Sequence, residues 1–235
     1  MTIQEQLLAA VGERRGAGAA DRICHACLTL RGVVAAAISL VYDGTNIGTL
    51  GASSAAARTY DELQFTLGEG PCLDSVTHRA PVVVTDLADP SQVRWPLYGP
   101  ALLAHRVHAV TAMPIVVAGE YVGALDLFRT RPGRPDDEEW AAALMAAELA
   151  QLPLLDVLDD DLQSAATDPD STAWTHLHTL ARAEVGQASG MLIAQLNIGP
   201  ADALMRLRAH AYATGVSATE TARDIIDRRL RLDAD

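Results

Sequence analysis

Hydrophobic positions in the first 150 residues follow two spacings, one typical of helices and the other of strands. Residues 2–31 carry apolar positions at helical spacing on both sides of a glycine-containing turn, which predicts one or two helices. Runs rich in Val, Ile and Ala predict strands at 33–42, 46–50, 81–85, 107–117 and 121–129. Further helices are predicted at 54–63, 71–78, 97–106 and 136–152. This mixed order predicts an α+β domain, with hairpins at 33–50 and 107–129.

The pattern changes after residue 152, where acidic residues replace the regular apolar positions. Residues 151–181 contain six aspartates and no basic residue, and they include Asp168-Pro169-Asp170. Such a composition predicts an exposed acidic connector over residues 153–173. The chain is therefore expected to divide into a first domain at 1–152, this connector, and a C-terminal domain at 174–235.

The C-terminal domain carries the signals of three helices. Apolar residues recur at intervals of three or four from Thr172 to Leu192, which predicts one long amphipathic helix. Gly199-Pro200 predicts the start of a second helix, and Gly215 predicts its end. Ser217-Ala-Thr-Glu220 has the spacing of a capping box and predicts the start of a third.

Charge and cysteine content narrow the class of protein. The chain has a net charge of −12, and all 18 of its basic residues are arginine. Residues 182–232 are the exception, with seven arginines against five acidic residues, so this segment alone favours a polyanionic partner. Three cysteines are too few for a disulfide framework, and no signal peptide or spanning apolar run is visible. We therefore expect a cytoplasmic protein with free thiols.

Three strings in the C-terminal domain are specific in combination. They are Arg182–Leu192 (RAEVGQASGML), Ala203-Leu204 with Leu207-Arg208, and Thr221–Asp227 (TARDIID). On three short helices in this order, they resemble an ANTAR domain, the RNA-binding module of bacterial transcription antiterminators. The resemblance covers residues 178–230. It implies an all-α three-helix bundle that dimerises and binds paired short RNA hairpins near a terminator.

Positive, amide-bearing and small side chains in these strings are the candidate RNA contacts. The candidates are Arg182, Gln187, Ala188, Ser189, Gly190, Arg206, Arg208 and Arg223. The arginines suit phosphate groups, Gln187 suits a base edge, and the small residues permit close approach of a nucleic-acid backbone. Ser189 is seven residues after Arg182 and is expected on the same helix face. Many ANTAR domains have lysine there, so this chain has one phosphate-directed charge fewer.

The first domain resembles a GAF domain of the actinobacterial type over residues 15–150. The matching strings are Ala36–Leu40, Leu63-Gln64, Gly68–Cys72 (GEGPC), Val82–Leu87, Trp95-Pro96, Met113–Ile115 and Gly123–Leu127. GEGPC is the most specific of them. The resemblance implies a central antiparallel sheet flanked by helices, a dimer, and a pocket for a small molecule or redox signal. Arg58, Trp95, Tyr98 and Asp126 are the residues expected to line such a pocket, although core packing is the alternative for each.

The chemistry expected of the cysteines and histidines is limited. Cys72 follows GEGPC at a predicted helix N-terminus, where its thiol pKa can be lowered, so it is the candidate redox residue. Burial as a small apolar side chain is the alternative. Cys24-His25-Ala26-Cys27 lies in a predicted helix without a second ligand pair, and the remaining histidines are scattered. We therefore assign no metal, no cofactor and no catalytic residue.

The sequence favours a GAF sensor that controls an ANTAR output over an enzyme. The regulator is expected to bind RNA, to respond to an unknown small molecule and to form a homodimer. We also expect the acidic connector, at Asp159–Asp161, to cover the arginine face in the inactive state. Two alternatives stay open: a dimeric protein-binding adaptor whose helices form only a dimerisation bundle, and a GAF-type methionine sulfoxide reductase.

Overall fold

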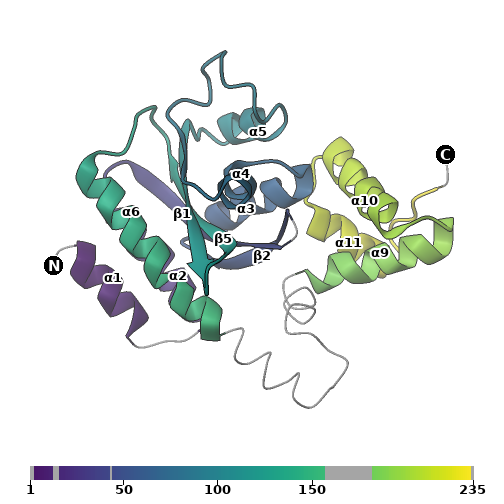
Figure 1. The fold of residues 1–235 in the computed structure, drawn as a ribbon. Helices are drawn as coiled ribbons and strands as arrows, with labels where there is room; N and C mark the ends of the chain where they lie inside the picture. The colour runs from purple at the N-terminus through teal and green to yellow at the C-terminus, as the bar shows by residue number, and fades with distance from the viewer. Residues whose placement is uncertain (1–2, 13–15, 43, 157–181, 234–235) are drawn as a thin grey trace.

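A computed structural model describes residues 3–12, 16–42, 44–156 and 182–233. The strands of the first domain form one central sheet (Figure 1). Its strands are β1 (Val33–Tyr42), β2 (Thr45–Ala52), β3 (Val82–Val84), β4 (Ala109–Val117) and β5 (Glu120–Arg129). They form one five-stranded antiparallel sheet in the order β2-β1-β5-β4-β3. The expected α+β fold with an antiparallel sheet is confirmed.

Helices cover both faces of this sheet (Figure 1). One face packs against α1 (Ile3–Val11), α2 (Gly16–Ala26), the short 3-10 helix η1 (Cys27–Thr29) and α6 (Asp137–Leu149). The other packs against α3 (Ala55–Leu67), α4 (Pro71–His78) and α5 (Tyr98–Ala104). Alternation along the strands sends Ile38 and Leu125 to the first face and Ala37 and Phe128 to the second.

A tight turn between α3 and α4 explains the GEGPC string. Gly68 ends α3 in the left-handed conformation, with φ of 70°. Gly70 has φ of 149°, and a Cβ at this position would lie 2.4 Å from the side-chain oxygen of Gln64. That same oxygen accepts a 2.9 Å hydrogen bond from the backbone N–H of Cys72. The glycines therefore bring the start of α4 into the interior, where the Cys72 thiol is fully buried.

The C-terminal domain is all-α in its described part. Its helices are α9 (Ala183–Leu196), α10 (Pro200–Thr214) and α11 (Ala218–Ile226). Their core side chains are Val185, Ala188, Leu192, Ala203, Leu207, Ala211, Ala218, Ala222 and Ile225. Gly215 ends α10 with φ of 69°, and both hydrogen bonds of the Ser217–Glu220 capping box are present. The helix signals at these positions predicted the bundle correctly.

One segment boundary differs from the prediction, and another lies at the edge of the described part of the chain. Residues 172–181 of the expected helix from Thr172 to Leu192 lie outside that part, which resumes at Arg182, the N-cap residue of α9. Residues 151–156, expected mostly in the connector, are helical, and Leu154 is buried in the core of the first domain. Burial of Leu154 keeps this segment on the first domain.

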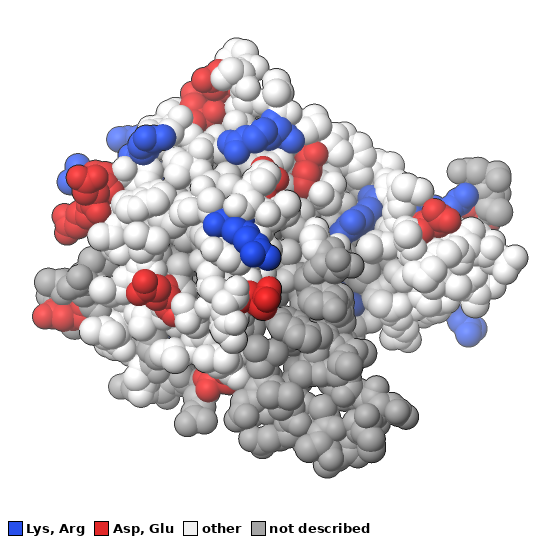
Figure 2. Space-filling view, in the orientation of Figure 1, with Lys and Arg blue, Asp and Glu red and all other residues white. Residues whose placement is uncertain are grey.

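The surface of the described residues carries charged side chains of both signs and several large apolar side chains. Basic and acidic side chains are interspersed on the face shown in Figure 2. The large exposed apolar side chains on α10 are Met205, at 61% exposure, and Tyr212, at 57%. Within the described ranges, no helix is both long enough and apolar enough to span a bilayer.

Candidate functional site

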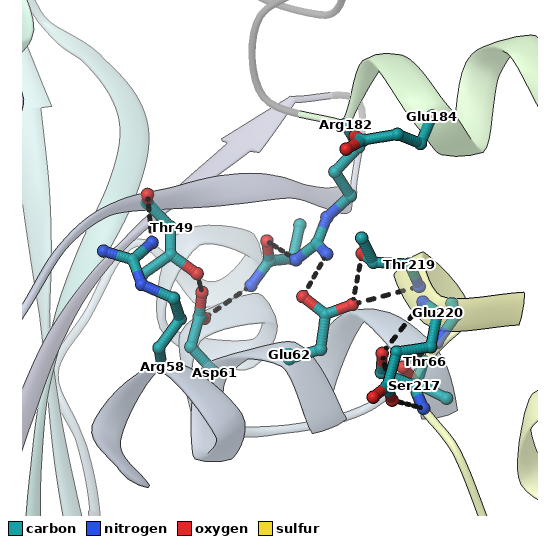
Figure 3. A network of polar contacts seen from close by, with 12 residues as sticks. Thr49, Arg58, Asp61, Glu62, Thr66, Arg182, Glu184, Ser217, Thr219 and Glu220 are labelled. Atoms are coloured by element: carbon teal, nitrogen blue, oxygen red, sulfur yellow. Dashed lines mark hydrogen bonds and ion pairs between the residues drawn. The ribbon is translucent and has the colours of Figure 1, made fainter. Parts of the chain in front are cut away.

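Helix α3 carries the side chains through which the first domain holds the C-terminal domain. Nη1 of Arg182, at the start of α9, donates a 2.6 Å hydrogen bond to Oε2 of Glu62 (Figure 3). The two side chains are only 7% and 19% exposed. Nη2 of Arg182 donates to the side-chain oxygen of Asn46 on β2, at 3.3 Å. The Arg182 side chain therefore contacts both β2 and α3.

The first turn of α11 is also capped by α3. The Thr219 hydroxyl donates to Oε1 of Glu62 at 2.6 Å, and the Thr219 backbone N–H lies 3.4 Å from the same oxygen. The Ala218 N–H donates to the Thr66 hydroxyl at 3.2 Å. A helix N-terminus has unpaired N–H groups and favours a negative charge. Glu62 thus serves two partners, Arg182 and the N-terminus of α11 (Figure 3).

Phe65 of α3 forms the apolar part of the domain contact. Its ring is 4% exposed and belongs to the core of the C-terminal domain rather than to either core of the sheet. The guanidinium carbons of Arg182 and Arg208 lie 3.9 and 4.5 Å from the ring centroid. Burial, followed by the positive charge of Arg182, lowers the pKa of Arg208 to about 10, so Arg208 stays charged at neutral pH.

A buried polar cluster continues from this contact into the first domain. Asn46, which accepts from Arg182, donates a 2.7 Å hydrogen bond to Oδ1 of Asp61. The Ser39 and Thr49 hydroxyls also donate to Asp61. Burial raises the pKa of Asp61, whereas the charge of Arg182 and these three hydrogen bonds lower it. The Asp61 carboxylate is thus the inner end of a polar path that begins at Arg182.

A second carboxylate lies close to the first. Asp126 of β5 is fully buried, and its Oδ2 accepts a 2.6 Å hydrogen bond from Gln64. Burial and then the neighbouring Asp61 charge raise the pKa of Asp126 well above its usual value. The Cys72 sulfur lies between α4 and this pair, so that donor atoms of Asp61, Cys72 and Asp126 are within 4.8 Å of one another.

The predicted RNA contacts fall into different environments. Arg182 is 8% exposed in the domain contact, and Ala188 is fully buried in the core of the bundle. Arg208 is half-buried against Phe65. In this arrangement these three residues are shielded from an external phosphate. Arg182 is the N-cap residue of α9, and its side chain enters the domain contact, whereas Ser189 lies within the helix.

The other RNA candidates lie nearer to solvent. Gln187 and Gly190 are exposed on α9, and Ser189 is half-buried. Arg223 is 56% exposed and forms a 3.3 Å ion pair with Glu184. Arg206 donates to the backbone oxygen of residue 233 at 3.2 Å. The structure therefore divides the candidates into a sequestered set and an accessible set.

The acidic residues expected to cover the arginines, at 159–161, lie outside the described part of the chain. Within that part, Glu62 and Phe65 of α3 contact Arg182, and Phe65 also contacts Arg208. Sequence reasoning missed both residues, because they lie on one helix of the first domain and have no motif that points to a partner 120 residues away in sequence.

The four residues expected to line a sensor pocket lie in different environments in the described part of the chain. Tyr98 is fully buried and donates its hydroxyl to the backbone oxygen of Tyr60 at 3.2 Å. Trp95 packs edge-on against Tyr98, with ring centroids 6.1 Å apart. Arg58 is half-exposed and pairs with Asp21 at 3.7 Å. Asp126 belongs to the buried polar cluster, so the packing alternative describes Trp95 and Tyr98.

A groove of about 660 Å³ runs between the two domains. Its lining combines apolar side chains, among them Leu63, Leu97, Val216 and the exposed ring of Tyr212, with the charged side chains of Arg58, Glu62, Glu220 and Arg223. The groove thus borders the ion pair between Glu62 and Arg182. A molecule bound there would contact both domains at once.

Cys72 does not have the environment expected of a reactive thiol. Burial, and then the negative charges of Asp126 and Asp61, raise the pKa of Cys72 well above its usual value. This direction is opposite to the lowering expected at a helix N-terminus, because the desolvated site and two carboxylates outweigh the short helix. Cys24 and Cys27 pack on the opposite face of the sheet.

Comparison with known proteins assigns both domains. A family model described as the GAF domain matches residues 17–152, and one described as the ANTAR domain matches residues 178–226. A search of curated protein sequences gave no significant match.

Solved structures resemble the first domain. The GAF domain from a phosphoenolpyruvate-protein phosphotransferase of Coxiella burnetii is 18% identical, with 69% of this chain and 95% of that chain covered and a TM-score of 0.50. The corresponding GAF domain from Acinetobacter is 8% identical, with 65% and 90% covered and a TM-score of 0.50. A free methionine-R-sulfoxide reductase from Neisseria meningitidis, in complex with its substrate, is 14% identical, with 63% and 82% covered and a TM-score of 0.47. The first two likenesses establish the fold of this domain.

Proposed function

This chain belongs to the GAF domain family over residues 17–152 and carries an ANTAR domain over residues 178–226, and from that premise we propose a signal-responsive RNA regulator. In this proposal the ANTAR domain binds short paired RNA hairpins and favours transcription through a terminator. The GAF domain binds an unidentified small molecule and sets how much of the ANTAR domain is available. An RNA target places this activity in the cytoplasm.

The observation that carries the proposal is the sequestration of arginines by α3. Arg182 pairs with Glu62 at 2.6 Å, and Arg208 packs against Phe65 on the same helix. A phosphate group competes with Glu62 for Arg182, because both are anions that accept from the same guanidinium. RNA binding through Arg182 therefore requires the two domains to separate. We assign the docked arrangement to the state with low RNA affinity.

Release of the ANTAR domain needs a signal that prefers the separated state. A change from 99% docked to 99% released requires about 5.5 kcal/mol of differential binding energy. A ligand with equal affinity for both arrangements changes nothing. The groove beside Glu62 is the site where such a ligand acts most directly, because a molecule there contacts both domains.

The accessible candidates define the surface that remains for RNA in the docked state. Gly186 and Gly190 lie on α9, and a Cβ built on either would meet nothing within 4 Å. Gln187 lies exposed between them. This side of α9 therefore permits close approach of an RNA backbone. The resemblance to ANTAR domains also implies a homodimer, which sedimentation of the purified chain tests directly.

The experiment begins with RNA crosslinked to the protein in its native host. Sequencing should recover paired hairpins beside terminators, and a variant with Arg206→Ala and Arg223→Ala should recover fewer. The recovered hairpin is then titrated with the purified wild type and with Glu62→Ala. We expect Glu62→Ala to bind more tightly, by up to about 100-fold, because loss of one partner of a buried ion pair costs about 3 kcal/mol or more.

A matched control and two outcomes make this test decisive. Glu148→Ala removes an exposed glutamate from α6, away from the domain contact, and should leave RNA affinity unchanged. If wild type recovers no more RNA than the variant with Arg206→Ala and Arg223→Ala, RNA binding is rejected and a protein-binding adaptor is favoured. Equal affinity of the wild type and Glu62→Ala rejects control by docking while RNA binding stands.

The reductase alternative has less support from the arrangement of the cysteines. A thiol-based reductase needs a second cysteine to form a disulfide with the oxidised one. Cys24 and Cys27 lie across the sheet from Cys72, and all three are buried. We therefore propose a regulator rather than an enzyme. Turnover of free methionine sulfoxide by the purified chain with a thiol reductant would contradict this choice.

A further inference from the structure

Asp61, Cys72 and Asp126 bring three metal-ligand atoms together inside the GAF domain. Asp61 lies on α3, Cys72 on α4 and Asp126 on β5. Their side-chain donor atoms lie within 4.8 Å of one another, and each residue is fully buried. Three separate elements therefore direct metal-ligand atoms to one point on the same face of the sheet.

The protein alone does not satisfy this cluster. Oδ1 of Asp126 is buried and has no hydrogen-bond partner, although Oδ2 accepts from Gln64 at 2.6 Å. A buried carboxylate oxygen without a donor is costly, and a second carboxylate nearby adds like-charge repulsion. A bound cation removes both costs, because it supplies the missing partner of Asp126 and separates the two negative charges.

The surroundings of the cluster resemble the outer shell of a metal site. Ser39, Thr49 and Asn46 all donate to Asp61 and so fix the orientation of its carboxylate. The Asn46 amide also lies 3.7 Å from the Cys72 sulfur, where it can donate to a thiolate. Outer hydrogen bonds of this kind orient ligands and tune the affinity for a metal.

We propose that Asp61, Cys72 and Asp126 bind one divalent transition-metal ion of the zinc class. A thiolate with two carboxylates suits a borderline-soft cation, whereas Mg²⁺ and Ca²⁺ prefer oxygen alone. Zinc bonds of about 2.3 Å to sulfur and 2.0–2.2 Å to oxygen place tetrahedral donors about 3.5 Å apart, so binding draws donor atoms that lie within 4.8 Å of one another together by no more than about 1.3 Å. Cys72 gives up its thiol proton, and a water molecule or signal molecule completes the coordination.

This site has a direct route to the domain contact. Asn46 donates to Asp61 and accepts from Arg182, so one side chain connects the metal ligand to the arginine held by Glu62. A metal ion that draws Asp61 toward Cys72 changes the position available to Asn46. The regulatory consequence, a metal-dependent change in RNA affinity, rests on the proposed function. The metal site itself does not.

Cobalt substitution tests the site in the full-length chain. The purified protein is stripped with a chelator and titrated with Co²⁺. We expect a thiolate-to-cobalt charge-transfer band in the near ultraviolet that saturates at one equivalent and disappears when Zn²⁺ is added. Cys72→Ser should remove the band, and Cys24→Ala, which changes a buried cysteine across the sheet, should retain it.

A second variant keeps the test valid if Cys72→Ser fails to fold. Asp126→Asn retains the thiol and should weaken Co²⁺ binding by about tenfold or more. The proposal is overturned if wild type gives no charge-transfer band. It is also overturned if a folded Cys72→Ser keeps the band, or if Asp126→Asn binds Co²⁺ as tightly as wild type.

RNA titrations with and without Zn²⁺ test the coupling separately. We expect the RNA affinity of wild type to change at least severalfold with Zn²⁺ and that of Cys72→Ser to stay constant. A cobalt band without any RNA binding rejects the proposed function and leaves the metal site established. A cobalt band with RNA affinity independent of Zn²⁺ rejects only the route through Asn46.

Discussion

Replacement of Phe65 by alanine tests the domain contact at its apolar centre. The ring is 4% exposed and packs between the guanidinium groups of Arg182 and Arg208. Its apolar neighbours belong to the core of the ANTAR domain. Phe65→Ala should therefore weaken the attachment of this domain and leave the sheet of the GAF domain intact.

The size of the effect follows from burial and from the two cation contacts. Loss of a buried phenylalanine side chain costs about 3–5 kcal/mol, which weakens docking by about 10²- to 4 × 10³-fold. Phe65→Leu is the matched control, because it keeps most of the apolar volume and removes the aromatic face. Two partly desolvated cation–π contacts contribute about 1–3 kcal/mol together, so Phe65→Leu should have an intermediate effect.

Hydrogen–deuterium exchange measures the weakening of domain docking at individual backbone amides. The Ala218 N–H donates to Thr66, and the Thr219 N–H lies 3.4 Å from Glu62, so both bonds exist only while the domains are docked. Phe65→Ala should speed exchange at these amides and leave the strands of the sheet protected. Unchanged protection of Ala218 and Thr219 in a folded Phe65→Ala protein would refute the claim that Phe65 holds the domains together.

Three further predictions concern stability. Gly123→Ala should destabilise the sheet by about 1–3 kcal/mol in chemical denaturation, because its Cβ would lie 2.2 Å from a backbone oxygen of β1; an unchanged denaturation midpoint contradicts this packing. Glu139→Gln should lower the free energy of unfolding by about 3–5 kcal/mol, because it leaves Arg129, which is 3.1 Å away and 10% exposed, buried without its ion pair. The melting temperature should fall. The control Glu138→Gln, which changes the exposed glutamate beside it, should not lower the melting temperature. The backbone N–H and hydroxyl of Ser217 donate to Glu220 and lower the Glu220 pKa from 4.5, so this carboxylate stabilises α11 above pH 4.5 and loses that effect as the pH falls through the lowered pKa. Wild type should accordingly be more stable than Glu220→Gln at pH 7, and the difference should shrink as the pH is lowered below 4.5. A pH-independent difference in melting temperature would show that the charge plays no part.

Local signals account for what sequence reasoning predicted correctly. The segment 71–78 is predicted as a helix and forms one, because Pro71 suits the first helical turn. The same holds for the end of α10 at Gly215 and the capping box at Ser217 and Glu220. Each signal acts over a few residues, so it does not depend on the rest of the fold.

The place of the Arg182 side chain is the opposite case. The sequence pattern treats Arg182 as one position of an amphipathic helix and as a candidate RNA contact. In the structure, Arg182 is the N-cap residue of α9, and its side chain contacts Glu62 and Asn46 of the first domain. A local pattern carries no information about a partner on another domain.

The sequence by itself determined the two domains, the sheet with its hairpins, the helices of the ANTAR bundle and the family of each part. These follow from periodicity, turn residues and short specific strings, all of which are local. Only the tertiary structure decided which candidate arginines are covered and which are accessible. It also decided that Asp61, Cys72 and Asp126 meet, because these residues come from three elements that packing brings together. Long-range contacts of this kind depend on how the helices pack against the sheet and against each other. No single segment of the sequence encodes this packing.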